Sequence, residues 1–432
     1  MKSLIRTALA LFALCSLSTL VLRAADPMAT NYTFAQCEGS LTPYPSDKIN
    51  PAVYPDSLIP VFVNHVGRHG ARYPASAAST LALRRALERA DSARTLTALG
   101  RKLLTLTATV QSLSADRWGA LDSLGEAEQR GIATRLFYNF GDIFAGPSTA
   151  RVKGLSSYSP RAMMSMYCFL HQLDRMDNRI EFATTTGRDN SLLMRPFDVD
   201  KDYLEFRKEA PWKPVYDEYF VSHCPLTAIR RVLGADFPYV DEDEARNLAI
   251  NEYYVVAGLQ AMGLRSEMAT YFTREEANAL WSCFNLRQYL CRTASTVSTV
   301  PEEIASALVL DLISTTDAFV TGEDTSTRAV FRFGHAETLM PLLSLLRLPG
   351  CRYLSNYFDT VAGSWRDFDV VPMAANLQII LFKSKKTGRY YVRFDLNEKP
   401  LKLRQGDDSS TIYPWGEARR YMMNCVPIYR NI

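Results

Sequence analysis

Two arginines and a histidine with phosphate-handling chemistry follow an apolar run near the N-terminus. The stretch reads VFVNHVGRHGARYP and contains Arg68, His69 and Arg72, with glycines at positions 67 and 70. Arginine offers a fork of donors that fits phosphate oxygens, and glycine lets the backbone approach a ligand closely. A histidine between two cations should have a lowered pKa and stay neutral. Its free lone pair could then attack phosphorus as a nucleophile.

A second polar cluster follows a later apolar run. The segment from Val330 to Phe333 leads directly into the sequence GHAE, which contains His335 and Glu337. In open α/β sheets, ligands bind beyond the carboxyl ends of the strands, so neighbouring strands would bring the two clusters together. A carboxyl group there could protonate a leaving oxygen, and arginines could stabilise the transition state. Together the clusters indicate phosphoryl transfer through a phosphohistidine, with neither a metal nor a cofactor.

Two nearby polar residues have simpler interpretations. His65 stands four residues before His69, a spacing that metal ligands can use, but no third ligand accompanies the pair. We therefore interpret His65 as a packing or hydrogen-bonding residue at the strand end. Arg332 interrupts an apolar strand, and we interpret it as a partner in a structural ion pair.

The periodicity of apolar residues predicts the elements that position both clusters. Pro160 suits the first turn of a helix, and the sequence TREE at 273–276 matches a capping box. The expected strands are 57–63, 151–157, 328–333, 377–382 and 390–394, and the expected helices are 79–113, 125–138, 160–173, 243–263, 273–290 and 337–347.

This order of elements predicts the α/β class. We expect a mixed, mainly parallel sheet flanked by helices on both faces, with a smaller, mainly helical cap domain inserted. Residues 26–180 and 301–432 would form the α/β core domain, and residues 181–300 would form the cap. Helices within 79–140 could also contribute to the cap.

The first 25 residues read as a cleaved export signal. Lys2 and Arg6 precede an uncharged run that is too short to span a membrane, and Ala24 and Ala25 follow it. The segment carries three basic residues, so its removal would bring the formal charge of +3 close to zero. Global charge therefore gives no reason to expect nucleic acid or an anionic membrane as a partner. We expect a periplasmic or secreted protein without a stable membrane span, with lipid anchoring through Cys15 as the alternative.

The cysteines give weak information. An odd number remains after the signal, so at least one thiol stays unpaired even if export allows disulfides. Buried free cysteines are a reasonable interpretation in a chain of this length. Five histidines and the lack of a CxxC pair give little support to a zinc site. The cysteines concerned are Cys37, Cys168, Cys224, Cys283, Cys291, Cys351 and Cys425.

The first polar cluster resembles a family signature. The sequence RHGARYP resembles the RHGxRxP motif of the histidine acid phosphatases, a group within branch 2 of the histidine phosphatase superfamily. The resemblance implies that His69 is the phosphorylated nucleophile and that Arg68 and Arg72 bind phosphate. The motif also follows an apolar strand in the N-terminal region, as it does in that family.

Further blocks along the chain agree with this resemblance. The sequence GALDSLGEAE is similar to the family's Leu-Thr-x-x-Gly segment, with Asp122 where threonine is usual. The sequence SSYSPRAMMSMYCFL resembles the segment that supplies a third phosphate ligand, which maps to Arg161, although the usual threonine and aspartate before it are absent. The sequence GHAE resembles the multiple inositol polyphosphate phosphatases, whereas most other members carry His-Asp. In that subgroup the roles of phosphate ligand and proton donor map to His335 and Glu337.

The resemblance implies an exported phosphomonoesterase that hydrolyses inositol polyphosphates, including phytate, through a phosphohistidine. The alternative is a broad histidine acid phosphatase acting on other monoesters. A non-catalytic polyanion-binding protein and a mutase-type transferase are less favoured. Arg188 and Arg195 are candidates to bind outer phosphates, and a monomer with a small polyanionic substrate is expected.

Overall fold

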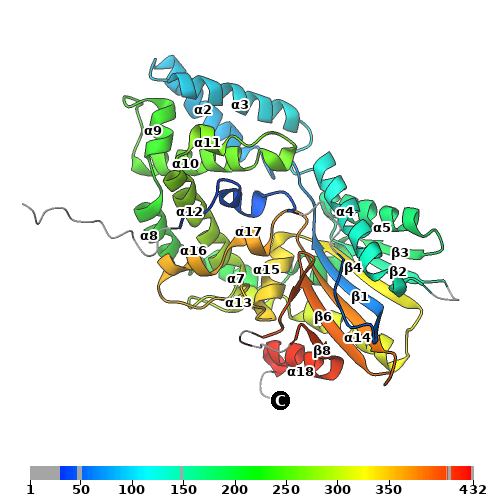
Figure 1. Cartoon of the computed structure of the whole chain (residues 1–432). Coiled ribbons are helices and arrows are strands. Elements are labelled where there is room, and N and C mark those ends of the chain that lie inside the picture. The colour runs from blue at the N-terminus through cyan, green and yellow to red at the C-terminus, as the bar shows by residue number, and fades with distance from the viewer. Residues whose placement is uncertain (1–29, 46–50, 146–148, 405, 407–409, 430–432) are drawn as a thin grey trace, which may run out of the picture.

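A mixed sheet forms the centre of the protein, and a large group of helices lies at one end of it (Figure 1). The structure is a computed structural model that describes residues 30–45, 51–145, 149–404, 406 and 410–429. The expected export signal at 1–25, with Cys15, lies outside the described residues.

Eight strands of the described chain make up the sheet. Strands β3 (Glu181–Thr186), β2 (Arg151–Ser156), β4 (Thr327–Gly334) and β1 (Leu58–Arg68) lie in that order and run parallel. Strand β1 pairs antiparallel with β5 (Asn376–Ser384), followed antiparallel by β6 (Tyr390–Leu396) and β7 (Lys399–Leu401), and β8 (Ile412–Pro414) also pairs with β6. Parallel pairing thus occupies the half of the sheet whose strand ends carry both polar clusters.

Helices cover both faces of this sheet. On one face, α4 (Ser123–Phe140) and α5 (Pro160–Met176) share an apolar cluster with Phe331 and Phe333 of β4. On the other face, α14 (Ser306–Thr321) and α18 (Trp415–Cys425) pack with Val330. Successive side chains of a strand point to opposite faces, which explains this alternation. The α/β class with helices on both faces is confirmed.

A group of helices beside the sheet, α2, α3 and α8 to α12, is here called the helical body. Its α2 and α3 pack on α9 and α10, although more than a hundred residues separate the two pairs in the sequence (Figure 1). The bounds are α2 (Ala78–Ser92), α3 (Ala98–Ser114), α8 (Lys213–His223), α9 (Thr227–Leu233), α10 (Glu242–Ala257), α11 (Met268–Tyr271) and α12 (Arg274–Arg292).

The continuous helical periodicity at 79–113 is broken in the structure. Arg94 takes a φ of 61°, in the left-handed region that ends helices, and Thr97 then caps α3 by accepting a hydrogen bond from the Gly100 N–H at 3.0 Å. Neither residue disturbs the leucine spacing, so the pattern concealed the break.

Three strands, β3, β7 and β8, were not predicted from the sequence. Strand β3 lies at the open edge of the sheet with mostly exposed side chains, so it lacks the apolar alternation that marks a half-buried strand. The capping box at the start of α12 is present as expected, between Thr273 and Glu276. The other helices are α6 (Ser191–Met194), α7 (Lys201–Glu209), α13 (Val300–Glu303), α15 (Ala336–Leu345), α16 (Val361–Ser364) and α17 (Asp367–Val370), with a 3-10 helix η1 at Gln36–Leu41.

One apolar helical stretch, at 300–321, has the length and composition to cross a membrane among the described residues. Most of it is α14, which packs against β1 and buries Leu308, Leu312 and Phe319. This is the environment of a core helix. No disulfide joins the seven described cysteines, and six of them are buried.

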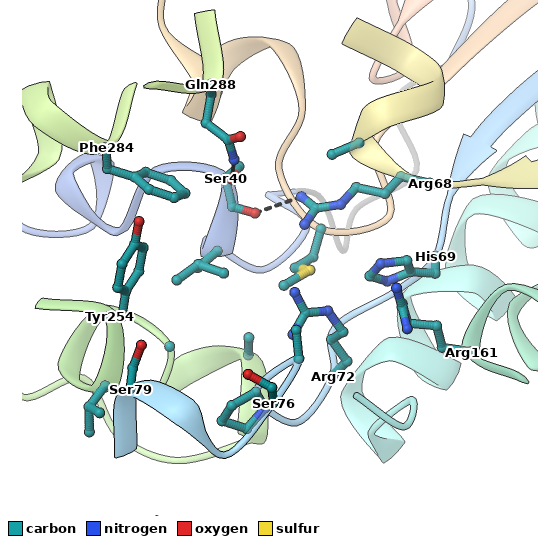
Figure 2. Close-up of a pocket in the computed structure, with 18 of the residues that line it drawn as sticks. Ser40, Arg68, His69, Arg72, Ser76, Ser79, Arg161, Tyr254, Phe284 and Gln288 are labelled. Atoms are coloured by element: carbon teal, nitrogen blue, oxygen red, sulfur yellow. Dashed lines mark hydrogen bonds between the residues drawn. The ribbon is translucent and has the colours of Figure 1, made fainter. Parts of the chain in front are cut away.

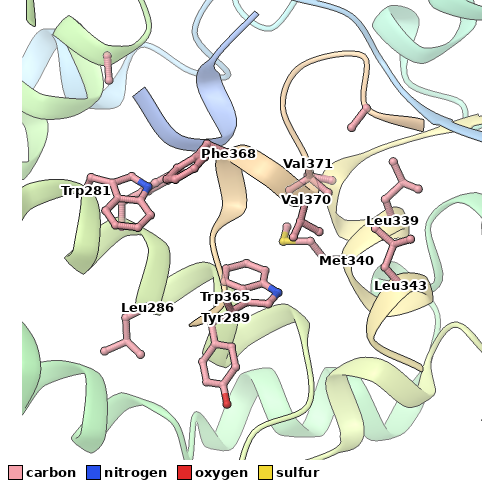
Figure 3. Close-up of a cluster of buried hydrophobic side chains, with 14 of the residues drawn as sticks. Trp281, Leu286, Tyr289, Leu339, Met340, Leu343, Trp365, Phe368, Val370 and Val371 are labelled. Atoms are coloured by element: carbon pink, nitrogen blue, oxygen red, sulfur yellow. The ribbon is translucent and has the colours of Figure 1, made fainter. Parts of the chain in front are cut away.

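An aromatic cluster joins the helical body to the sheet. Trp281 and Tyr289 of α12 lie beside Trp365 and Phe368, and Leu339 of α15 belongs to the same core (Figure 3). Ring centroids of Tyr289 and Trp365 are 5.8 Å apart, and those of Trp281 and Phe368 are 5.2 Å apart. Burial of such large side chains fixes α12 relative to the start of α15.

Glu252 is a buried carboxyl group in the helical body. It is inaccessible to solvent, and neither oxygen has a hydrogen-bond partner within the described structure. Burial, reinforced by the nearby carboxylate of Glu276, raises the pKa of Glu252 from 4.5 to about 8. The folded protein therefore keeps a proton that the unfolded chain releases, and stability is lost as pH rises from 4.5 to 8.

We expect Glu252→Gln to remove the loss of stability that the buried carboxyl group causes as pH rises. Its stability relative to the wild type should grow from near zero at pH 4.5 to roughly 3–4 kcal/mol at pH 8, since each pKa unit corresponds to about 1.4 kcal/mol. Urea unfolding across this range measures the difference, and Glu323→Gln, at an exposed position, should follow the wild type. A gain independent of pH would contradict the interpretation.

Candidate active site

The two polar clusters meet because β1 and β4 are parallel neighbours. Arg68 at the end of β1 is opposite Gly334 at the end of β4, and the His69 N–H donates to the Gly334 carbonyl at 3.1 Å. The rings of His69 and His335 consequently lie edge to face, with centroids 5.6 Å apart. This is the convergence expected from the sequence.

A cavity of about 340 Å³ lies above these strand ends. Figure 2 shows Arg68, His69, Arg72 and Arg161 gathered on one side of it. Glu337 also lines the cavity, and Tyr254 and Gln288 of the helical body lie across from the arginines. Five of the six site residues expected from the sequence therefore line one cavity, and the sixth, His335, contacts Arg161.

His69 is held as a neutral imidazole with a defined tautomer. Its Nδ1 lies 2.9 Å from the Gly70 carbonyl oxygen. A carbonyl only accepts hydrogen bonds, so Nδ1 carries the proton and the lone pair is on Nε2. Burial and then the charges of Arg161, Arg68 and Arg72 hold the pKa of His69 well below its usual range. The unprotonated Nε2 is thus available as a nucleophile.

The three arginines repel one another in a buried place. Burial, followed by the charge of Arg161, lowers the pKa of Arg72 to about 9, and burial lowers the pKa of Arg68 to about 10. The Nε of each of the three has no hydrogen-bond partner among the described residues. Arg68 is nevertheless fixed, because its Nη1 donates to the carbonyls of Ser40 and Val371 at 2.6 Å each. Such a cluster favours a bound dianion.

His335 is surrounded by donors. Its Nε2 lies 2.9 Å from Nη1 of Arg195 and 2.9 Å from Oγ of Ser157, and its Nδ1 lies 3.4 Å from Nη2 of Arg161. Both guanidinium groups can only donate, and the contact with Arg195 is the shorter, so Nε2 accepts from Arg195 and the ring proton is on Nδ1. The 3.4 Å contact between Nδ1 and Arg161 then joins two donors. The Nδ1–H of His335 and the guanidinium of Arg161 can both donate to one anionic oxygen. Burial, opposed by Glu337 and supported by Arg161 and Arg195, lowers the pKa of His335 to about 3.

The arginines proposed for outer phosphates occupy different places. Arg195 lies beside the inner site, where it contacts His335 and pairs with Asp198 at 2.6 Å. The Arg188 guanidinium lies over the Tyr158 ring, 4.6 Å from its centroid. The position of Arg195 was not visible in the sequence, because it depends on how the segment after β3 folds back toward β4.

Helix α4 clamps the loop that carries His69. A Cβ on Gly70 would lie 2.4 Å from the Gly125 carbonyl oxygen, and a Cβ on Gly125 would lie 2.2 Å from the Ala71 carbonyl oxygen. Glu128 accepts from the Ala71 N–H at 2.7 Å, and Gln129 donates to the Arg68 carbonyl at 3.0 Å. Sequence reasoning gave neither side chain a role, although Glu128 is the last residue of the GALDSLGEAE block and Gln129 follows it.

Glu337 lies in the first turn of α15, and Arg292 of α12 approaches it. The distance from Arg292 Nη2 to Glu337 Oε1 is 3.0 Å. Burial alone would raise the pKa of Glu337, but the charge of Arg292 and its hydrogen bond to the carboxylate outweigh burial and hold the pKa below its usual range. In the unliganded protein Glu337 is thus a carboxylate.

The two residues interpreted as structural have structural surroundings. The ring of His65 packs among Phe169, Phe331 and Phe333, and neither of its nitrogens has a hydrogen-bond partner in the described chain. Arg332 is buried and pairs with Asp311, its Nη2 lying 2.5 Å from Oδ2. Among the described residues, no cluster of three potential metal ligands occurs.

Comparisons with known proteins agree with this geometry. The family model of the histidine phosphatase superfamily (branch 2) matches residues 207–397. Multiple inositol polyphosphate phosphatase 1 of Homo sapiens is 26% identical over 320 residues, which are 68% of this chain and 64% of the human protein. The Gallus gallus protein of the same name is 24% identical over 376 residues, covering 83% of this chain and 81% of its own. The alignment with the human protein spans just under two thirds of its length.

Solved structures show the same fold. The multiple inositol polyphosphate phosphatase of Bifidobacterium longum, in complex with inositol hexasulfate, has a TM-score of 0.75 at 18% identity, covering 90% of this chain and 97% of its own. The phytase from D. castellii has a TM-score of 0.67 at 18% identity, covering 94% and 89%. Residues 207–397 of the chain are thus similar to branch 2 of the histidine phosphatase superfamily, and the fold agrees with that similarity.

The contact between Gly70 and Gly125 gives a first test of the site. Gly125→Ala should push the His69 loop out of place, because the added Cβ meets backbone rather than a movable side chain. We expect turnover of any phosphomonoester to fall at least about tenfold, with about 1–3 kcal/mol of lost stability from overpacking. Gly363→Ala, where a Cβ would meet no atom within 4 Å, is the matched control. Wild-type turnover in Gly125→Ala would show that the clamp is unimportant.

Proposed function

We propose that this protein hydrolyses inositol polyphosphates, including phytate, through a phosphohistidine intermediate on His69. The observation that carries the proposal is a neutral His69, with its lone pair on Nε2, which lies among three arginines and lines the same cavity as Glu337. The names of the similar human, chicken and Bifidobacterium longum proteins support the choice of substrate.

In the first step, Nε2 of His69 attacks phosphorus in line. The N–P bond forms as the P–O bond to inositol breaks, and the electron pair passes to the leaving oxygen. Glu337 in its protonated form gives that oxygen a proton. Arg68, Arg72 and Arg161 bind the phosphoryl oxygens and stabilise their charge in the transition state.

In the second step, water replaces inositol. Glu337, now a carboxylate, takes a proton from this water as it attacks phosphorus, and the N–P bond breaks with its electrons returning to Nε2. Inorganic phosphate leaves, and His69 is again neutral. The surroundings of Glu337, which favour the carboxylate, suit this role as a base.

The space beyond the inner site favours a substrate with several phosphates. A second cavity of about 550 Å³ adjoins the first, and both are lined by Tyr254, Phe284, Arg287, Gln288 and Glu337. Four arginines line the second cavity, as expected for a space that binds several anionic groups. They are Arg195, Arg207, Arg287 and Arg292. A broad monoesterase would not need this second basic chamber, so relative turnover of phytate and simple monoesters decides between the two functions.

Export stays part of the proposal. The basic start, the apolar run and Ala24-Ala25 are the observations that support a cleaved signal at 1–25. Export would also separate the enzyme from cytosolic phosphorylated metabolites, which disfavours a mutase-type transferase. The N-terminal sequence of the mature protein tests cleavage, and a lipid on Cys15 would instead indicate anchoring.

We expect His69→Ala to abolish turnover of phytate, because no other group replaces the attacking Nε2. Quenching the wild type during turnover of ³²P-phytate should trap acid-labile, alkali-stable label on His69. His171→Ala, at an exposed position on α5, is the matched control and should keep wild-type turnover and labelling. Near-native turnover in His69→Ala would rule out the nucleophile, and absence of label would favour a polyanion-binding protein.

Glu337→Gln should separate the two steps. With phytate, whose alkoxide leaving group needs a proton, turnover should fall by about 10²–10⁴-fold. With p-nitrophenyl phosphate the first step needs no proton, but the second step still lacks its base. Rapid-mixing measurements should then show a burst of one p-nitrophenolate per enzyme before a slow steady state. Loss of the burst would contradict the assigned role.

A further inference from the structure

Glu337 lies at the boundary between the two cavities. It lines the inner cavity, which contains the phosphate-binding arginines, and also the second cavity, which contains Arg292. The protonation of a carboxyl group at this boundary depends on charged groups bound in either cavity. Glu337 is also the group that must change its protonation state between the two steps of the proposed reaction.

Arg292 is the closest cation to Glu337. Its Nη2 donates to Oε1 at 3.0 Å, while its Nε is buried without a hydrogen-bond partner in the described residues. Glu337 therefore does not exhaust the donors of this guanidinium. The contact is held in place by the fold, because the cluster of Trp281, Tyr289 and Trp365 packs α12 beside the start of α15 (Figure 3).

The electrostatics of the free site conflict with the first step. A proton donor must be protonated when the P–O bond breaks, but the charges around Glu337 favour its carboxylate. The ionisable groups that act on it come from several elements. They are Arg292 of α12, His335 at the start of α15, Arg68 and Arg72 around the end of β1, Arg161 of α5 and Tyr203 of α7. The substrate itself must therefore shift this balance.

We propose that Arg292 is a positioning residue that couples occupancy of the second cavity to protonation of Glu337. A phosphate group there accepts hydrogen bonds from Arg292 and weakens its hold on the carboxylate. Glu337, left between two phosphate dianions, takes a proton from solvent and passes it to the leaving inositol oxygen as the P–O bond breaks. A monophosphate fills only the inner cavity and leaves Arg292 on Glu337. This inference rests on the role assigned to Glu337 under the proposed function.

If Arg292 acts in this way, substrates with one and with several phosphates should differ in kcat as well as in affinity. A second phosphate would raise the rate of leaving-group departure, not only the affinity. Monophosphates with poor leaving groups would be turned over slowly, whereas p-nitrophenyl phosphate, which needs no proton donor, would escape this control in the first step.

The test compares wild type and Arg292→Gln on phytate and on β-glycerophosphate, a monophosphate with an alkoxide leaving group. Rates are normalised to those on p-nitrophenyl phosphate. In Arg292→Gln, normalised kcat on β-glycerophosphate should rise about tenfold at pH 6, since losing a close cation raises the pKa of Glu337 by about one unit or more. The alkaline limb of its kcat–pH profile should move to higher pH. KM for phytate should rise, and its kcat should not.

Two further variants separate this coupling from a structural role. Arg292→Lys keeps the charge and should restore the wild-type pH limb. Arg231→Gln removes the arginine partner of Glu276 at the other end of α12 and should leave both pH profiles unchanged. The inference would be overturned if Arg292→Gln lowered the normalised kcat equally on phytate and β-glycerophosphate and left the alkaline limb of the kcat–pH profile in place. Failure of the wild type to hydrolyse phytate would instead overturn the proposed function.

Discussion

Repulsion among buried guanidinium groups is the constraint on which this site depends. Arg68, Arg72 and Arg161 face one cavity, and none of them forms an ion pair with a carboxylate in the described structure. Burial makes this repulsion stronger than it would be in water. The same charges keep His69 neutral. The positive charges that repel one another thus also keep the nucleophile unprotonated and attract a phosphate dianion.

The surrounding structure opposes this repulsion with fixed hydrogen bonds. The carbonyl of Ser40 accepts from Arg68, while the Ser40 N–H donates to the buried Asp367 at 2.8 Å. Asp367 also accepts from the Trp281 indole at 2.9 Å, so this support reaches α12 of the helical body. Burial raises the pKa of Asp367 to about 6. Rigid contacts of this kind hold a site whose own charges would push it apart.

The sequence revealed much of the fold because its strong patterns coincide with buried elements. Strands β1, β4, β5 and β6 are rich in apolar and aromatic residues, and α5 and α12 carry clear start signals. The prediction missed α14, although that helix has a buried apolar face, and it failed at two places where burial leaves no pattern. Strand β3 lies exposed at the sheet edge, and the break between α2 and α3 depends on one backbone angle at Arg94. The limits of the cap domain stay a prediction.

The sequence by itself determined the chemical groups: two arginines and a histidine at one strand end, and His335 and Glu337 at another. A short motif is enough to recognise these groups, because the residues of each cluster lie close together in the sequence. Only the tertiary structure decided how they act. The pairing of β1 with β4 places His69 beside His335. The packing of α12 places Arg292 on Glu337. Contacts between residues far apart in the chain set the charge of both groups, because electrostatic energy depends on distance in space.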